Sequence, residues 1–413
     1  MRVLCTTTGS PSHGRAQLPL LRALAAAGHE VLVVTNPSLA SVFQDDDLRL
    51  DTTMPDLDPR ARMMERADEL AALPKDDTAV LHGAIAKLLF RGMAETGAKI
   101  SLEGVFPLAK EFQPDLILRD GFDLGAVLIA ERLGIPHLPT PSGAMNILDP
   151  ADVLPYFNAT REEVGLPTYD DPLSVVPHGR VDCVPPEFTF ARNLPPTWSY
   201  RQTVDVERAS VLPRWVAELP TDRPLVYAAI GTALPKMLEL SNDANDAPEG
   251  APEGAAPPFE FPDPTAALRT IADALSRLED CTVVLTTSGI PLDTDGLPSH
   301  VHVTERLPQP ILLESVDLFL THGGFNSIRE SLRTATPLAV LPQFGDQHAN
   351  ALRAQELGIG RAVTDTAPDA IAAVCRDVLA DDSIAARART ARLAMLAMPG
   401  IEAAVGDLEK LTA

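Results

Sequence analysis

The sequence has few aromatic residues, few cysteines and no long apolar run. Aromatic residues make up 5% of its 413 residues, with 2 Trp and 4 Tyr. No stretch of about 20 apolar residues occurs, so the sequence predicts no membrane-spanning helix. The four cysteines lie far apart and form no CxxC pair or Cys/His cluster: Cys5, Cys183, Cys281 and Cys375. This spacing argues against a zinc site and is typical of free thiols in a reducing compartment.

Basic charge is also scarce. The chain has 34 Lys and Arg against 57 Asp and Glu, a formal net charge of −23. A surface this acidic repels nucleic acid and anionic lipid, so we expect neither as a partner. Any phosphate group must therefore be held locally, by backbone N–H groups and helix ends. The segment Met1–Thr6 resembles a strand rather than a charged leader, and we expect the protein in the cytoplasm.

What the sequence does contain is apolar material for two cores. It is 45% hydrophobic and 22% charged, and its length favours two domains. Apolar segments at 2–8, 18–27 and 31–35 predict strand, helix and strand, which is a βαβ unit and hence a parallel sheet. A second alternating series runs over 225–341. The sequence therefore predicts an α/β protein with two parallel-sheet domains.

The predicted boundaries follow from these series. We expect a first domain over 1–200, a linker over 201–224 and a second domain over 225–390. A C-terminal helical segment, 391–413, is expected to pack back toward the first domain. Residues 241–264 form an acidic, proline-rich insertion. Composition favours a solvated insertion, and the alternative is a lid over a cleft.

Two side chains that could take part in proton transfer follow strands of the first domain. Open parallel sheets bind ligands beyond the carboxyl ends of their strands. His13 stands there at the start of a helix, where the dipole favours a neutral imidazole that can take a proton from a hydroxyl. Asp120 follows the strand at 115–119 and could bond His13 Nδ1 as a His–Asp dyad. The alternatives are a histidine and an aspartate that cap their own helices, although Asp123 is the better placed cap.

The string from Thr321 to Glu330 predicts a diphosphate site. Its paired glycines let the backbone approach a ligand, and Asn326 and Ser327 can cap the following helix and donate to oxyanions. It matches neither the Walker loop nor the GxGxxG fingerprint. Glu330, one turn into the helix, could accept hydrogen bonds from ribose hydroxyls.

A second polar loop and three acidic strings complete the candidates. Asp346 and Gln347 follow the strand at 338–341, and their complementary hydrogen bonding suits a polyhydroxylated ligand, although a polar turn is an ordinary alternative. The DxD-like strings at 45–47, 56–58 and 293–295 lie in polar loops. We interpret them as solvated surface rather than as metal–diphosphate sites.

Together these strings resemble family 1 glycosyltransferases of the GT-B fold, in the bacterial branch that glycosylates macrolides and other natural products. The resemblance covers most of the chain. In the first domain it runs through His13, the Leu18–Leu20 segment and the Gly28–Val31 segment. In the second it runs from Pro308-Gln309 through Asp346-Gln347 to Glu356–Gly358, and the THGGxNSxxES string before a DQ pair is highly specific.

The resemblance implies a fold, an activity and a set of partners. Two Rossmann-like domains would face a central cleft, with the acceptor bound by the first and the nucleotide sugar by the second. The enzyme would be an inverting, metal-independent glycosyltransferase of the hexosyltransferase type. It would transfer a sugar to a hydroxyl of a hydrophobic natural product such as a polyketide or macrolide. No cofactor beyond the nucleotide sugar is implied, and the chain would be a monomer or homodimer.

The resemblance also implies roles for particular residues. His13 would be the base that deprotonates the acceptor hydroxyl, and Asp120 its partner. The residues implied to bind the donor are Gly231, Thr232, Arg306, Leu307, Gln309, His322, Gly324, Phe325, Asn326, Ser327, Glu330, Asp346 and Gln347.

The chain departs from the family pattern at three positions. Ser12 replaces the usual Gly before the base, and Ala16 replaces the usual Pro after it. Arg306 stands where an aromatic residue commonly stacks on the nucleobase, which leaves the base preference open. The Asp346-Gln347 pair favours UDP-glucose, and a TDP-sugar is the alternative donor.

Two other functions fit the same fold. One is a nucleotide-sugar epimerase-like enzyme, which would need no acceptor. The other is a catalytically silent helper protein, and the presence of both His13 and Asp120 argues against it.

Overall fold

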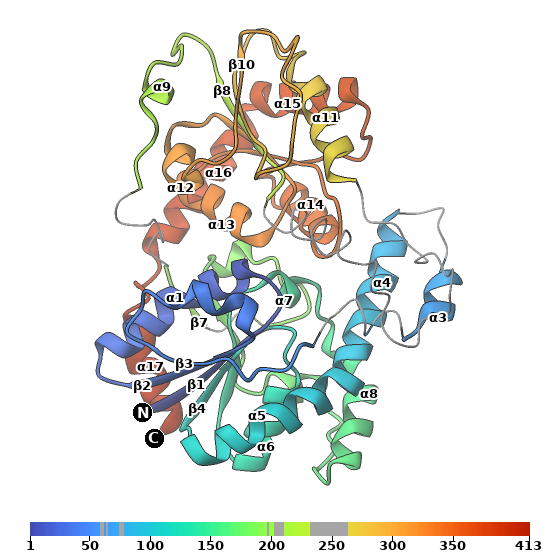
Figure 1. Ribbon diagram of the computed structural model, residues 1–413, viewed down its shortest axis with the longest axis vertical. Helices are drawn as coiled ribbons and strands as arrows, with labels where there is room; N and C mark the ends of the chain where they lie inside the picture. The colour runs from blue at the N-terminus through green and yellow to red at the C-terminus, as the bar shows by residue number, and fades with distance from the viewer. Residues whose placement is uncertain (58–61, 63–64, 74–77, 196–197, 202–209, 232–262) are drawn as a thin grey trace. The chain divides into compact units, whose positions relative to one another are not determined.

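The computed structural model describes residues 1–57, 62, 65–73, 78–195, 198–201, 210–231 and 263–413 (Figure 1). They form two compact units. Unit 1 is Met1–Thr203 with Leu396–Ala413, and unit 2 is Val204–Met395. The predicted donor residue Thr232 and all but the last two residues of the acidic insertion 241–264 lie outside the described residues. The sequence-based domain boundaries and the lid stay predictions.

Unit 1 is built on a five-stranded parallel sheet with the order β3-β2-β1-β4-β5. Its strands are β1 (Arg2–Thr7), β2 (Glu30–Thr35), β3 (Arg49–Asp51), β4 (Leu116–Arg119) and β5 (His137–Pro139), and β6 (Val181–Asp182) pairs separately with β7 (Trp198–Ser199). Val3 of β1 lies opposite Val31 on one side and Leu116 on the other.

Helices pack on both faces of this sheet, as the period of two along a strand requires. Val3 and Cys5 face a core that includes Leu21 of α1 and Leu408 of α17. Leu4, between them, faces the core on the other side. The helical elements are α1 (Pro11–Ala26), η1 (Pro37–Val42), α3 (Ala67–Ala71), α4 (Thr78–Gly92), the π-helix η2 (Met93–Gly97), α5 (Ala98–Phe112), α6 (Gly125–Leu133), α7 (Gly143–Ile147), α8 (Pro150–Glu163), η3 (Pro172–Val175), η4 (Pro186–Phe188) and α17 (Ala403–Thr412).

The first helix begins earlier than the sequence predicts. Its expected start was Leu18, whereas α1 starts at Pro11. Proline is favoured in the first turn because that turn has no internal acceptor for its N–H. His13 therefore lies within the first turn of α1, in agreement with its expected place at the start of a helix.

Unit 2 contains a six-stranded parallel sheet with the order β10-β9-β8-β11-β12-β13. Its strands are β8 (Leu225–Ala229), β9 (Thr282–Thr286), β10 (Val301–Thr304), β11 (Leu318–Thr321), β12 (Leu338–Val340) and β13 (Gly360–Ala362). Its helical elements are α9 (Arg214–Ala217), α11 (Pro264–Leu275), α12 (Gln309–Leu312), η5 (Leu313–Ser315), α13 (Phe325–Thr334), α14 (Gln347–Glu356), α15 (Pro368–Ala380) and α16 (Asp382–Ala397). The predicted two-sheet α/β fold is confirmed.

Both sheets reverse their winding at an equivalent point. In unit 1 the chain moves outward from β1 to β3 and then returns to the other side of β1 as β4. In unit 2 it moves outward from β8 to β10 and returns beside β8 as β11. Helices that leave neighbouring strands in opposite directions open a crevice at the strand ends, where such sheets bind ligands. The loops after β1, β4, β8 and β11 are therefore the places to look for a site.

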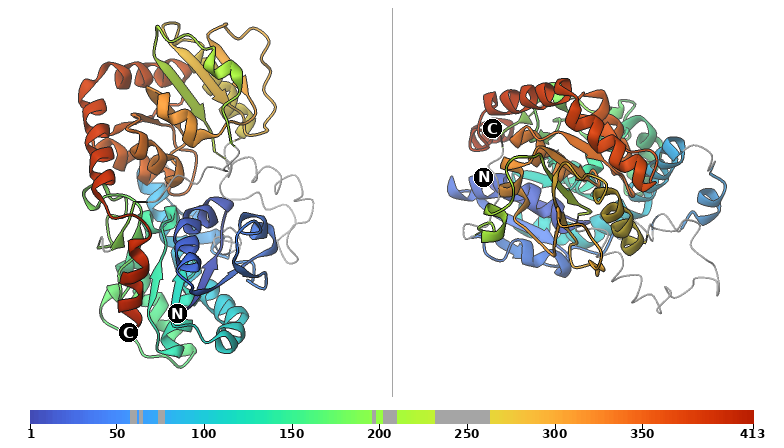
Figure 2. Two further views of the ribbon diagram at one scale, coloured as in Figure 1. Left: turned by 90° about the vertical axis from the view of Figure 1, so that its left-hand side faces the viewer. Right: turned by 90° about the horizontal axis from the view of Figure 1, so that it is seen from above.

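The end of the chain belongs to unit 1. Backbone hydrogen bonds join Arg201 to Pro399 and Ile401, and the Tyr200 hydroxyl donates to Asp407 Oδ2 at 2.8 Å. Thr412 Oγ1 lies 3.1 Å from Met1 Sδ. The two termini thus lie side by side in this unit (Figure 2).

Candidate functional site

The first group of candidate side chains lies where the unit 1 sheet reverses. His13 follows β1 on α1, and Asp120 follows β4 directly. His13 Nδ1 and Asp120 Oδ2 are 2.7 Å apart. The imidazole is 15% exposed and the carboxylate is fully buried. The structure thus brings together the two residues that the sequence predicts as a dyad.

The carboxylate is held in place by the backbone around it. Asp120 N donates to Thr6 O at 3.0 Å, and Asp120 Oδ1 accepts from Phe122 N at 2.9 Å. Oδ2 is the atom that faces His13. An ionised carboxylate only accepts hydrogen bonds, so His13 Nδ1 carries the proton. In the neutral ring the lone pair then lies on Nε2, which is the atom that can act as a base.

Phe122 also packs against the imidazole. Its ring stacks on His13 with centroids 5.9 Å apart and an interplanar angle of 15°. The ring centroid of Phe90 lies 5.5 Å from that of Phe122. Phe122 was not among the residues predicted from the sequence. Its place two residues after Asp120, in the same strand-end loop, is the signal that could have found it.

Buried charges lie next to the dyad. Asp123 Oδ1 accepts from Ser101 Oγ at 2.7 Å and from Ala126 N at 3.2 Å, at the start of α6. Burial raises the pKa of Asp123, against the lowering effect of these bonds and of Arg119. Burial lowers the pKa of Arg119 to about 10, so this side chain is still a cation at pH 7. The N-cap of α6 is Leu124, without a side-chain cap, so Asp123 lies one residue before the expected capping position. Its bond to Ala126 N still ties it to the first turn of α6 and leaves Asp120 to face His13.

The second group of candidates lies where the unit 2 sheet reverses. Gly231 follows β8 and has φ +76°, and His322 follows β11. A Cβ on Gly231 would lie 2.5 Å from His322 Nε2, and one on Gly324 would overlap the same ring nitrogen. Glycine at both positions therefore lets the backbone close around the imidazole.

His322 is neutral at pH 7. Burial lowers its pKa to about 4, although the backbone of Ala229 opposes the shift. Its Nδ1 is buried and has no hydrogen-bond partner among the described residues. A neutral imidazole beside a diphosphate acts as a hydrogen-bond donor and not as a cation.

Three predicted donor residues form one polar network. Gln309 Nε2 donates to Glu330 Oε2 at 2.7 Å and lies 3.3 Å from Ser327 Oγ. Tyr227 OH donates to Gln309 Oε1 at 3.4 Å, and it lies 3.1 Å from Thr286 Oγ1. The start of α12 and the first two turns of α13 are thereby joined, with a carboxylate at the centre. Tyr227 is a member that the sequence analysis missed.

The side chains of Asp346 and Gln347 have different hydrogen-bond partners. Asn350 Nδ2 donates to Asp346 Oδ2 at 2.7 Å and to Gly323 O at 2.9 Å, which ties this loop to the glycine pair after β11. Gln347 is 3% exposed, and its Oε1 accepts from Gln343 N at 2.8 Å. The Gln347 carbonyl thus supports its own loop. Asn350, one helical turn after Asp346, was not predicted.

The remaining predicted donor residues lie just before α12 or at the start of α13. Arg306 is 78% exposed and lies 3.4 Å from Glu305 Oε1. Leu307 is half-buried and Phe325 is buried. The expectation that Asn326 or Ser327 caps α13 is wrong. The helix begins after Gly324 without a side-chain cap, and Asn326 Oδ1 instead accepts from Arg329 Nε at 2.9 Å.

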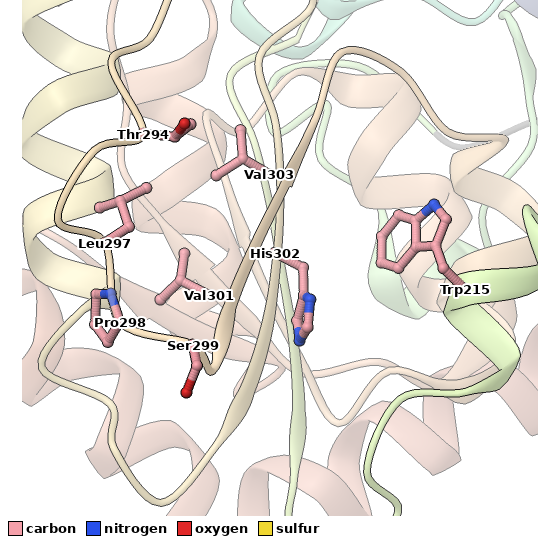
Figure 3. Close-up of a pocket in the computed structure, with 8 residues that line it drawn as sticks. All are labelled: Trp215, Thr294, Leu297, Pro298, Ser299, Val301, His302 and Val303. Carbon is pink, nitrogen blue, oxygen red and sulfur yellow. The ribbon is translucent and has the colours of Figure 1, made fainter.

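A pocket of about 520 Å³ lies elsewhere in unit 2 (Figure 3). The edge strand β10 and the loop before it form most of its lining. Trp215 of α9 stacks on His302 with centroids 5.9 Å apart. The pocket is lined by Trp215, Thr294, Leu297, Pro298, Ser299, Val301, His302 and Val303. None of these eight residues was predicted as a site residue.

Within the described part of the chain, no group of three or more His, Cys, Asp or Glu side chains could hold a metal ion. None of its helices is long and apolar enough to cross a membrane. The described cysteines Cys5, Cys183, Cys281 and Cys375 are free thiols.

Known structures and sequences identify the class of protein. The solved structure of spinosyn rhamnosyltransferase SpnG complexed with thymidine diphosphate superposes with a TM-score of 0.71 at 22% identity, covering 99% of this chain and all of that one. The chain is 25% identical to aclacinomycin-T 2-deoxy-L-fucose transferase of Streptomyces galilaeus, over 100% of this chain and 96% of that protein. It is also 25% identical to 3-alpha-mycarosylerythronolide B desosaminyl transferase of Saccharopolyspora erythraea, over 100% and 99%. The fold is GT-B, and the protein is a glycosyltransferase.

The family is equally clear. The N-terminal domain model of proteins like erythromycin biosynthesis protein CIII matches residues 22–231, and the corresponding C-terminal domain model matches 269–411. The chain belongs to this EryCIII-like family, in the natural-product branch of the family 1 glycosyltransferases. The resemblance inferred from the sequence is confirmed. The roles of the individual site residues stay predictions.

Proposed function

We propose that this protein is an inverting, metal-independent glycosyltransferase that transfers a sugar from a nucleoside diphosphate to a hydroxyl of a hydrophobic natural product. The observation that carries the proposal is the 2.7 Å contact between His13 Nδ1 and Asp120 Oδ2. An acceptor hydroxyl has a pKa far above 7 and needs a base as it attacks the anomeric carbon. Asp120 orients the imidazole and stabilises the imidazolium that forms when His13 takes the proton.

The leaving group is the other half of the reaction. The diphosphate carries two negative charges in the nucleotide sugar and gains a third as the bond to the anomeric carbon breaks, and this developing charge needs stabilisation. The start of α13 offers backbone N–H groups and the positive end of a helix dipole. Neutral His322 lies beside it and can donate one further hydrogen bond. We assign the diphosphate to this loop, and the ribose to Glu330 within its network with Gln309.

We propose a TDP-linked sugar as the donor, in place of the UDP-glucose that the sequence favours. The UDP-glucose expectation rests on hexose contacts from the Asp346-Gln347 pair. Gln347 Oε1, however, already accepts from Gln343 N and Phe344 N. The thymidine diphosphate in the SpnG complex and the 2-deoxy-L-fucose named for the Streptomyces galilaeus relative support the same choice.

Calorimetric titration of the purified chain with TDP, UDP and UDP-glucose tests the donor site. Each titration is run in EDTA and again with Mg²⁺. The proposal expects micromolar TDP binding that is the same under both conditions and tighter than UDP binding. Tighter UDP binding would restore the UDP-sugar alternative. A requirement for Mg²⁺ would contradict the metal-independent mechanism, and failure to bind any of the three would contradict the donor site itself.

A transfer assay tests the reaction. The chain is incubated with the nucleotide sugar that binds and with a panel of macrolide and polyketide aglycones, and mass spectrometry detects the glycoside. The proposal expects an O-glycoside whose anomeric configuration is opposite to that of the donor. Retention of configuration would contradict direct displacement by an acceptor activated at His13.

A further inference from the structure

One buried polar side chain in unit 1 is not accounted for by the dyad or by a core role. Gln17 lies on α1, one turn after His13, and is 1% exposed. Its neighbours along the buried side of the helix are Ala16, Leu18, Leu20 and Leu21. Burying a primary amide is unfavourable unless its hydrogen bonds are made, so its contacts should explain its presence.

All the hydrogen-bonding capacity of the amide is used. Gln17 Nε2 donates to Thr6 O at 3.1 Å and to Thr140 Oγ1 at 2.9 Å. Gln17 Oε1 accepts from Thr7 Oγ1 and lies 3.5 Å from Cys5 Sγ. These partners come from the end of β1 and from the residue that follows β5. The single side chain therefore attaches the first turns of α1 to two different strand ends.

The same contacts lead to Asp120. Thr6 O, which accepts from Gln17 Nε2, also accepts from Asp120 N at 3.0 Å. Thr140 Oγ1 donates in turn to Arg119 O at 3.0 Å, the residue before Asp120. A closed path results: from His13 along one helical turn to Gln17, through Thr6 O to Asp120 N, and from the Asp120 carboxylate back to His13.

We propose that Gln17 is a positioning residue for the dyad. It fixes α1 against the end of β1 and, through Thr140, against the end of β4, and so keeps His13 and Asp120 in contact. Residues four apart lie on one face of a helix, so an anchor at Gln17 restrains the rise and rotation of the turn that carries His13. The hydrogen bond between His13 and Asp120 is short, and it weakens steeply with misalignment. The catalytic consequence rests on the proposed function, whereas the structural role does not.

Substitution of Gln17 by methionine isolates this role. Methionine has a similar length and volume, so the packing is retained while the four polar contacts are lost. Thr6 O keeps Asp120 N, and Thr140 Oγ1 keeps Arg119 O, so the chain is expected to fold. Gln17→Glu provides a second variant of nearly the same shape, which has at most one proton to donate in place of two.

Proton NMR of the full chain without ligand reads out the dyad directly. A proton on His13 Nδ1 that is hydrogen-bonded to a carboxylate gives a downfield resonance, assigned by its loss in His13→Ala. The proposal expects this proton to exchange with water at least tenfold faster in Gln17→Met than in the wild type, with an intermediate rate in Gln17→Glu. In the transfer assay kcat should fall about tenfold or more while TDP affinity stays unchanged.

Tyr200→Phe is the matched control. It also removes one hydrogen bond of a buried side chain in unit 1, from Tyr200 OH to Asp407 Oδ2, and it should lower the melting temperature without altering the His13 resonance. Wild-type exchange in both Gln17 variants, or an equal increase in Tyr200→Phe, would overturn the proposal. A chain that shows the expected resonance changes but transfers no sugar would contradict the proposed function and leave the role of Gln17 standing.

Discussion

The imidazole of His322 fills the space that a side chain at position 231 would need. The strands before them, β8 and β11, are hydrogen-bonded neighbours. A Cβ on Gly231 would lie 2.5 Å from His322 Nε2, closer than any real contact of this kind. The backbone of one strand end is thus shaped around the side chain of the next.

Gly231→Ala should therefore weaken nucleotide binding. The added methyl group must displace the His322 ring, and φ of +76° is itself unfavourable for alanine by about 1–2 kcal/mol. We expect TDP affinity to fall at least tenfold by calorimetry. Gly296→Ala in the same unit is the control, because its φ is +85° but nothing lies within 4 Å of the added Cβ. Equal TDP affinities in the two variants would show that the His322 contact is irrelevant to binding.

His13→Ala should remove the base. We expect kcat for transfer to fall by roughly 10²–10⁴-fold, the usual contribution of a general base. TDP affinity should stay within about twofold of the wild type, because the nucleotide loops belong to unit 2. Single-turnover kinetics together with calorimetry separate the two quantities. A wild-type rate in this variant would exclude His13 from the mechanism.

Glu330→Ala should reduce donor affinity without altering the dyad. It removes the carboxylate that accepts from Gln309 Nε2 at 2.7 Å and that we assign to the ribose. A hydrogen bond to a charged group contributes about 1.5–3 kcal/mol, so the dissociation constant for TDP should rise about 10–150-fold. The control ligand is pyrophosphate, which lacks the nucleoside, and its affinity should not change. A parallel loss of pyrophosphate affinity would place Glu330 with the diphosphate instead.

A buried histidine in unit 1 should make the protein less stable in acid. Burial and the nearby Arg119 lower the pKa of His137 well below its ordinary value. The unfolded chain takes up this proton near pH 6.5, whereas the folded chain does not. The unfolded state therefore binds more protons at lower pH, and the free energy of unfolding falls as the pH drops below about 6.5.

His137→Leu tests that dependence. Within the described structure neither ring nitrogen of His137 has a hydrogen-bond partner, so leucine removes an unfavourable burial. The variant should match or exceed the wild-type melting temperature at pH 7.5 and exceed it by a larger margin at pH 5. A difference in melting temperature that is independent of pH would show that His137 is not protonated on unfolding.

The sequence predicted the architecture and the main site residues because their signals are local. A strand followed by a glycine-rich loop and a helix is a short, continuous segment, as from β11 to the end of α13 over residues 318–334. His13 and Asp120 were found because each lies in the segment that follows a strand, although 107 positions separate them. Their contact depends only on which strands are neighbours, and a doubly wound sheet restricts that choice.

The remaining features depend on side-chain directions that no local pattern fixes. Gln17 resembles an interruption in a leucine-rich helix until Thr6 and Thr140 are known to lie beside it. Gln347 was expected to face a ligand, and its Oε1 is instead used by its own loop. Asn326 and Ser327 are residue types that often cap helices, but the N-cap of α13 is Gly324, two residues before Asn326 and three before Ser327.

Unit 1 is assembled from two pieces of chain that are distant in sequence, and this matters for recombining glycosyltransferases. Arg201 Nη1 donates to Leu396 O at 3.0 Å, and the core beneath α1 contains Ile401 and Leu408. A single crossover between this chain and a relative near residue 203 would give each hybrid a first unit whose last helix came from the other parent. An exchange of the second unit that preserves the first needs two crossovers, with residues 396–413 kept from the same parent as the N-terminal segment.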